Sequence, residues 1–159
     1  MGVTITQDLY PRLSGEIRYL FEQSNARLQS GGVSTTLRGQ AHVVHYDILY
    51  HFRKVNRPVR PYVAAGVGVK IYRATGDDVA YRPLMQYAWL TRATETKPMF
   101  SLGGGVKFQL HGRLTFRLDV RDQLTRFPSN IITPAPGYTL GGWLHDFVPT
   151  AGLSWMLPR

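Results

Sequence analysis

Residues 60–73, RPYVAAGVGVKIYR, alternate between two kinds of side chain, and this alternation restricts the possible folds more than any other feature of the chain. One set of alternate positions is aliphatic from Val63 to Ile71, and the other holds glycines, Lys70 and two tyrosines. A period of two is typical of a β-strand, whose successive side chains point to opposite faces. The Gly-x-Gly is not a dinucleotide-binding fingerprint, because Ile71 stands where the third glycine belongs and no helical pattern follows.

The same alternation recurs along the chain, and turn-forming residues separate the segments. It predicts an all-β fold of seven antiparallel strands, with these bounds: 2–9, 13–28, 40–52, 61–74, 98–110, 113–125 and 147–157. Short turns and longer loops alternate between them, which is typical of an up-and-down meander with its longer loops at one end. Residues 1–159 are predicted to form a single domain.

Two kinds of barrel satisfy this pattern: a soluble barrel with its apolar face inside, and a membrane barrel with its apolar face outside in lipid. Glycines on the charged face favour the membrane barrel, because glycine weakens a strand unless a bulky neighbour must approach it closely. These glycines are Gly66, Gly68, Gly103, Gly105 and Gly152. Charges in a polar interior need partners. The predicted interior charge network comprises Glu16, Arg18, Asp47, Lys70, Lys107, Arg117, Asp119 and Arg121.

The apolar face is then predicted to contact lipid, with aromatic residues forming girdles at the two membrane interfaces. This lipid-facing and girdle set comprises Tyr46, Tyr50, Phe52, Phe100, Phe108, Phe116 and Trp155. The long loop after residue 74 is unusually apolar, and exposed apolar patches tend to be contact sites. Its predicted partner contacts are Tyr81, Met85, Tyr87 and Trp89. The basic turn from Arg53 to Arg60 is compatible with anionic headgroups, with a partner protein or with plain solvation.

Composition excludes several classes of function. Disulfides and thiolate metal sites are excluded because the chain has no cysteine. Its net charge of +9 comes from scattered residues without an aromatic-interleaved basic stripe, so no nucleic-acid partner is expected. The longest apolar run, Val63 to Val69, is too short for a membrane-spanning helix. The first residues, MGVTITQDLY, lack the pattern of a signal peptide.

Candidates for chemistry are few. His45, Asp47 and His51 share the interior face, but the two-residue spacing along a strand separates side chains by about 7 Å, which is wide for one ion. No metal and no cofactor is therefore predicted. Ser101 and Ser154 also face the interior, with His45 and Glu16 as possible partners of a nucleophile. No catalytic residue is predicted, since no other feature supports such a site.

Three segments, RPYVAAGVGVKIYR, FSLGGGVKFQLHGRLTFRLDVRD and FVPTAGLSWML, together resemble the OmpA-type small outer-membrane β-barrels of Gram-negative bacteria. The resemblance covers most of the chain and lies in patterns rather than in invariant motifs. It implies a location in the bacterial outer membrane, eight antiparallel strands, a periplasmic N-terminus and short periplasmic turns. It also implies a closed polar interior.

Two departures from that family pattern stand out. The sequence supplies seven strands, and the order of its connections indicates that the first of the family's eight is missing. Bacterial single-chain barrels have even strand numbers, so we expect an open seam that a partner, another copy or an unassigned upstream strand fills. Pro149, inside the last strand, fits an unpaired edge. The terminal aromatic is displaced, because Trp155 is followed by four more residues.

The sequence thus predicts a non-enzymatic outer-membrane barrel, a structural, anchoring or interaction protein with a closed polar interior and partner-binding outer loops. Two alternatives stay open. The first is a soluble, lipocalin-like barrel that binds a ligand among interior apolar side chains. The second is a lipid-modifying outer-membrane enzyme.

Overall fold

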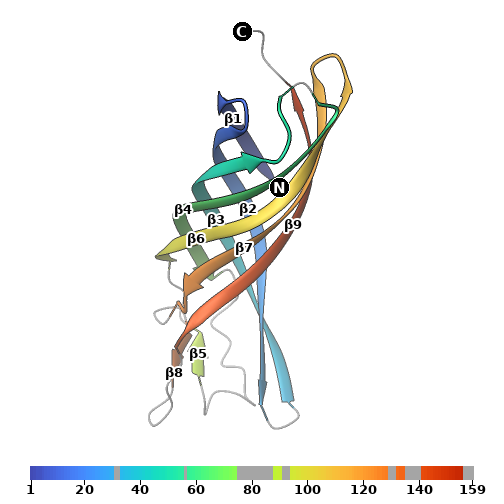
Figure 1. The fold of residues 1–159 in the computed structure, drawn as a ribbon. Coiled ribbons are helices and arrows are strands. Elements are labelled where there is room, and N and C mark those ends of the chain that lie inside the picture. The colour runs from blue at the N-terminus through green and yellow to red at the C-terminus, as the bar shows by residue number, and fades with distance from the viewer. Residues whose placement is uncertain are drawn as a thin grey trace.

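The computed structural model describes residues 1–30, 33–55, 57–74, 88–90, 94–128, 132–134 and 141–155, and its regular structure is entirely β. Seven strands form one antiparallel sheet in chain order (Figure 1). They are β1 (Gly2–Tyr10), β2 (Leu13–Ser30), β3 (Val33–His51), β4 (Val59–Ala74), β6 (Thr94–His111), β7 (Leu114–Arg126) and β9 (Trp143–Trp155). The prediction of seven antiparallel strands in an up-and-down order is confirmed.

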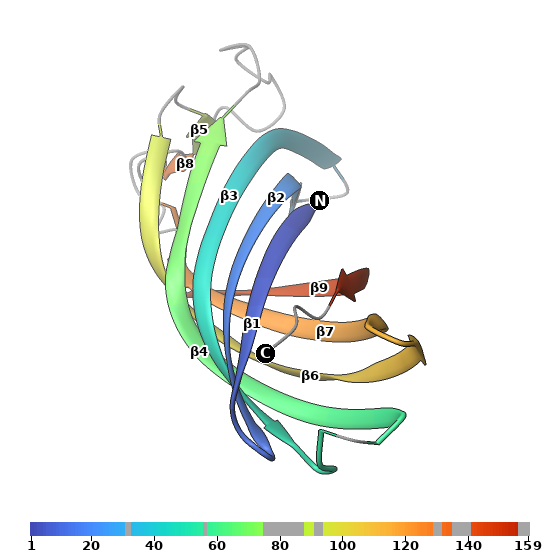
Figure 2. The same ribbon diagram turned by 90° about the horizontal axis from the view of Figure 1, so that it is seen from above.

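The large sheet curves around a concave interior (Figure 2), but β1 and β9 do not pair with each other in the part of the chain that the structure describes. All neighbouring strands are antiparallel, so the first and seventh strands of the sheet run in the same direction. Direct pairing of these two edges would create one parallel ladder in an antiparallel sheet. The sheet is therefore open along one seam and is not a closed barrel.

Several strands extend further than the sequence predicts. The β2–β3 hairpin continues to the pair Ser30 and Val33, through a stretch that reads as a loop because it is rich in Ser, Thr and Gly. The last strand begins at Trp143 rather than at residue 147, since Trp143 pairs with Arg126. In both cases the ladder of the neighbouring strand overrides weak local β-propensity.

A second sheet joins two connections that are far apart in the sequence. It consists of the short strands β5 (Ala88–Leu90) and β8 (Ile132–Pro134), which pair antiparallel. Both were predicted to be loop. A three-residue strand is too short for alternation to identify. The described residues contain no helix that is long and apolar enough to cross a membrane.

The connections gather at two ends of the sheet (Figure 1). We call the end formed by residues 11–12, 52–58 and 112–113 the short-turn end, and the opposite end the long-loop end. Backbone hydrogen bonds hold the first two turns against neighbouring strands. The His51 N–H donates to the Arg12 carbonyl at 2.8 Å, and the Gln109 N–H donates to the Pro58 carbonyl at 2.8 Å. These bonds place the three short turns side by side.

Candidate functional site, an ionic interior beneath an apolar outer face

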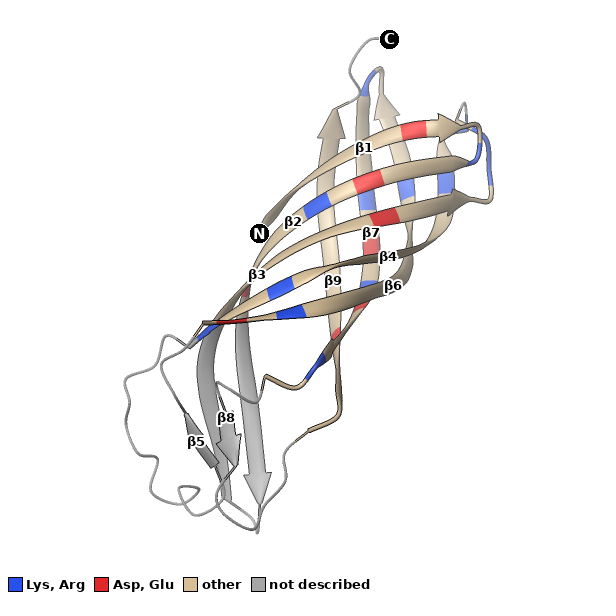
Figure 3. Ribbon diagram, turned by 90° about the vertical axis from the view of Figure 1, so that its left-hand side faces the viewer, with Lys and Arg blue, Asp and Glu red and all other residues tan. Residues whose placement is uncertain are grey.

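The curved sheet buries its charges and exposes its aliphatic side chains. Glu16, Lys70 and Arg121 are all 0% exposed. On the opposite face, Val67 is 58% exposed and Leu118 is 45% exposed. Figure 3 shows how the charged positions recur along the strands that surround the interior. This burial of charged residues and exposure of aliphatic residues follows from strand alternation. The register between neighbouring strands keeps the charged residues of each strand on the same side of the sheet.

Glu16 is one centre of the interior network. Its carboxylate accepts hydrogen bonds from Arg117 at 2.5 and 2.9 Å and from Arg18 at 2.9 Å. The Thr6 hydroxyl on β1 donates a further bond at 2.9 Å. Glu16 lies on β2 and Arg117 on β7, so this ion pair crosses the interior and joins two strands that are not neighbours in the sheet.

Asp119 is the second centre, on β7. Arg18 donates to its two carboxylate oxygens at 3.2 and 2.7 Å, and the Arg117 Nε donates at 2.7 Å. The Tyr62 hydroxyl donates at 2.7 Å, and the Thr150 hydroxyl on β9 donates as well. Five hydrogen bonds satisfy a carboxylate that is otherwise removed from water, as a buried charge requires.

Lys70 forms a third centre, nearer to the long-loop end. Its ammonium group donates to Glu22 at 2.8 Å, to Gln123 at 2.9 Å and to Asp146 at 2.6 Å. The Gln123 amide donates in turn to Glu22 at 2.8 Å. A lysine ammonium has three donors, so this arrangement uses each of them.

The rest of the network lies against the ring of Tyr62. The guanidinium carbon of Arg117 lies 5.2 Å from the ring centroid, that of Arg121 lies 5.8 Å away, and the ammonium nitrogen of Lys107 lies 5.7 Å away. These distances are in the range of cation–π contacts. Arg121 also lies 3.3 Å from an oxygen of Asp47, whose other oxygen is 2.9 Å from His45 Nδ1.

All eight predicted network residues lie on the interior face. Lys107 is half-buried, and the other seven are buried. Sequence reasoning did not assign Tyr62, Gln123, Thr150 or Asp146 to the network, although strand parity places each of them on the charged face. It also placed Arg60 in the basic turn, whereas Arg60 is buried and its guanidinium lies 3.8 Å from Asp8. Because Arg60 is two residues before Tyr62, strand alternation places its side chain on the same interior face.

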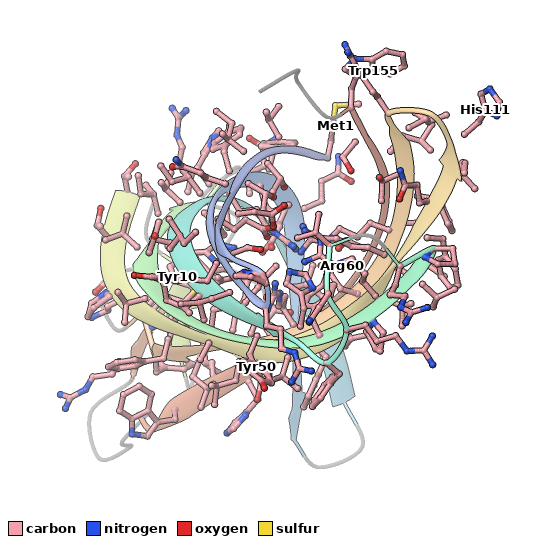
Figure 4. The ribbon with its side chains drawn as sticks, turned by 45° about the horizontal axis from the view of Figure 1, so that its top comes forward. Met1, Tyr10, Tyr50, Arg60, His111 and Trp155 are labelled. Atoms are coloured by element: carbon pink, nitrogen blue, oxygen red, sulfur yellow. The ribbon has the colours of Figure 1, made fainter. Side chains whose placement is uncertain are left out.

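The predicted lipid-facing and girdle residues lie on the outer face. Tyr46 is 44% exposed and Phe100 is 51% exposed. The outer aromatics touch one another near both ends of the sheet: Phe108 stacks on Phe116 with centroids 6.3 Å apart, and Phe100 lies 6.2 Å from Trp143. Tyr50, Phe52 and Trp155 lie toward the short-turn end. In Figure 4, Trp155 and His111 project away from the curve of the sheet, within which Arg60 lies.

Of the four predicted partner contacts in the long loop, the structure describes one, Trp89. Tyr81, Met85 and Tyr87 lie outside the described residues, and of Trp89 only the backbone is described, paired with Thr133.

The interior glycines make room for the network, as their position on the charged face predicts. A methyl group at Gly105 would lie 2.7 Å from the Tyr62 hydroxyl and would also meet Asp119 and the backbone of Leu118. Gly66 faces Asp47, Gly68 faces His45, and Gly103 faces Arg121 in the same way. Gly152 differs, because a methyl group there would have no described atom within 4 Å.

Replacing Gly105 by alanine is therefore expected to lower the free energy of unfolding by about 1–3 kcal/mol, the usual cost of overpacking. Gly152→Ala is the matched control, on the same face but in open space, and should change stability by less than about 0.5 kcal/mol. Denaturant titration of both variants measures the difference. Equal stability of the two variants would mean that the interior is not packed around Gly105.

The serines and histidines of the interior do not form a catalytic triad among the described residues. Ser101 is buried, and Ser154 donates to the Thr115 carbonyl at 3.4 Å. The Ser–His contact that the structure does show, Ser14 with His51 at 3.0 Å, was not anticipated. Its acid, Asp8, accepts from Ser14 at 2.6 Å instead of bonding to the histidine as a triad acid does.

His45 and Asp47 are engaged with each other, and His51 is engaged with Ser14. Within the described ranges, no group of three or more potential ligands is placed to hold a metal ion. Comparisons of the chain with protein-family models, with curated protein sequences and with solved structures give no match.

Proposed function

We propose that this chain is a small outer-membrane β-barrel protein of the OmpA type, with a structural, anchoring or interaction role and without catalysis. The observation that supports this proposal is the inverted burial, in which the ionic side chains are inside and the aliphatic side chains are outside. In water, this distribution would leave the aliphatic side chains exposed, and the folded chain would lack the hydrophobic stabilisation that folding depends on. Against hydrocarbon it is favourable, because the apolar face contacts lipid and most of the interior charges pair with one another.

The length of the outer face supports the same proposal. Trp143 and Trp155 lie on the same face of β9, twelve residues apart. At about 3.3 Å per residue they are about 40 Å apart along the strand. A strand tilt of about 40° reduces this to about 30 Å along the membrane normal, close to the roughly 25 Å apolar band between aromatic girdles.

The unpaired edges of β1 and β9 favour a partner that pairs with both of them. In our proposal a single additional strand, antiparallel to both β1 and β9, closes the barrel. Two copies of this chain inserted in the same direction cannot supply it by edge pairing, because β1 of one copy would meet β9 of the other in parallel. With the seam closed, the packed side chains fill the interior, so we propose no passage of solutes.

The soluble, lipocalin-like alternative requires the opposite burial. In that fold, Val67, Leu118 and their neighbours would line the interior around a ligand, and the charges would lie in water. The burial of Glu16 and Asp119 gives that alternative no support.

Purification with and without detergent tests the proposal. We expect the chain to be folded in nonionic detergent or lipid vesicles and to aggregate when the detergent is removed. Near-UV circular dichroism reports folding, and light scattering gives the mass of the protein in the particle, which also shows whether a second protein occupies the seam. A monodisperse, folded chain in plain buffer would contradict the proposal.

A further inference from the structure

The short-turn end of the sheet carries a cluster of exposed cations that the interior network does not use. They come from all three short turns, and we call them the basic rim: Arg12, Arg53, Lys54, Arg57 and Arg113. The sequence indicates a basic turn only over residues 53–60, and the structure changes its membership. Arg60 leaves it for the interior, whereas Arg12 and Arg113 join it because the fold places their turns beside residues 52–58.

The basic rim has no anionic partner within the described part of the chain. None of its five side chains takes part in an ion pair. The two carboxylates nearest in sequence to Arg12 are both engaged elsewhere. Asp8 accepts from Ser14 at 2.6 Å and lies 3.8 Å from Arg60, and Glu16 accepts from Arg18 and Arg117. Figure 3 shows basic residues, without acidic ones, on the turns at this end.

Exposed aromatic and aliphatic residues lie next to the basic rim on the outer face. Tyr10 is 68% exposed, Phe52 is 54% exposed and Trp155 is 66% exposed. Aromatic rings prefer the level of the lipid headgroups, and arginine and lysine extend from that level toward phosphates. The arrangement thus places a ring of cations just beyond a band of interfacial aromatics, where the phosphates of a bilayer would be.

We propose that the basic rim binds the headgroups of anionic phospholipids in the leaflet at the short-turn end. The inference rests on the proposed membrane function and adds a lipid specificity to it. Lipid headgroups suit this rim better than a folded acidic protein does, because the five cations are spread over three separate turns. A fluid anionic surface contacts all of them without shape complementarity. Each lysine or arginine near such a surface contributes to the attraction.

Lipid selectivity of the whole 159-residue chain in bilayers tests the inference. The chain is reconstituted in phosphatidylcholine vesicles that contain a trace of spin-labelled phosphatidylglycerol or spin-labelled phosphatidylcholine. The fraction of motionally restricted label measures lipid at the protein surface. We expect a preference for phosphatidylglycerol of at least about threefold, falling toward onefold as salt rises to 1 M.

The test variant is Arg53→Gln/Lys54→Gln/Arg57→Gln, which should lose most of the preference. The control variant, Arg73→Gln/Arg126→Gln, removes two exposed cations at the long-loop end and should keep it. All changed side chains are exposed, and circular dichroism of each reconstituted variant checks its fold.

Insertion into the bilayer without a preference for phosphatidylglycerol would overturn this inference and leave the proposed function intact. A preference that the triple variant retains would also overturn it. Salt-sensitive binding of polyglutamate by the inserted wild type, without lipid selectivity, would assign the basic rim to an acidic macromolecule instead. Failure of the wild type to enter any bilayer would overturn the proposed function itself.

Discussion

Replacing Asp119 by leucine is expected to cost about 3–5 kcal/mol in the free energy of unfolding, the usual cost of removing one partner from a buried ionic network. Arg18 and Arg117 both donate to Asp119, as do Tyr62 and Thr150. Leucine accepts none of these bonds. Both guanidinium groups then lose a carboxylate while they stay away from water, and Glu16 alone has to neutralise them.

Equilibrium unfolding in lipid vesicles, followed by tryptophan fluorescence, measures this cost. Asp122→Ala is the control on the same strand, because Asp122 lies on the opposite face and pairs with His145, whose side chain is 54% exposed. This pair lies outside the interior network, so removing Asp122 leaves no interior cation without a carboxylate and should cost much less than Asp119→Leu. A loss below about 1 kcal/mol for Asp119→Leu would show that the interior network is open to water.

Replacing Leu118 by arginine is expected to cost about 2–4 kcal/mol in a bilayer, the usual cost of a charge at the midplane on the lipid face of a barrel. Leu118 lies on the outer face near the middle of β7 and is 45% exposed. If that face were in water, the same substitution would change stability by less than about 0.5 kcal/mol, as surface substitutions do. The two environments therefore give distinct results from one variant.

Leu114→Arg provides the matched control for this prediction. Leu114 is the first residue of β7, on the same face as Leu118, and directly follows Arg113 of the basic rim. Near an interface the cost of arginine falls to about 0–1 kcal/mol. Vesicle unfolding curves for the two variants should differ accordingly, and equal costs would contradict a membrane depth gradient along β7.

Strand parity was enough to predict most of the fold and of the interior. It gave the seven strands, and it put residues such as Glu16 and Arg117 on the charged face, because a period of two depends only on local sequence. The glycines predicted the sense of the burial, since Gly105 and Gly103 are tolerable only where bulky neighbours approach.

Parity could not predict which charges pair. Glu16 and Arg117 are 101 residues apart, and their contact depends on how far the sheet curves. Tyr62 was missed as a hydrogen-bond donor to Asp119 for the same reason. Pairing between β5 and β8 joins two loops that carry no alternation, and the extension of the β2–β3 hairpin depends on the partner strand rather than on its own residues.

The proposed function requires the outer face to lie against lipid, and site-directed spin labelling of that face tests this orientation. The chain has no cysteine, so single cysteines at Val67, Leu118 and Val120 label one outer position each. In phospholipid vesicles the attached nitroxides should be accessible to oxygen, which concentrates in hydrocarbon, and protected from a water-soluble nickel chelate. High accessibility to the nickel chelate with low accessibility to oxygen at these positions would show that the aliphatic face lies in water, and the account would be wrong.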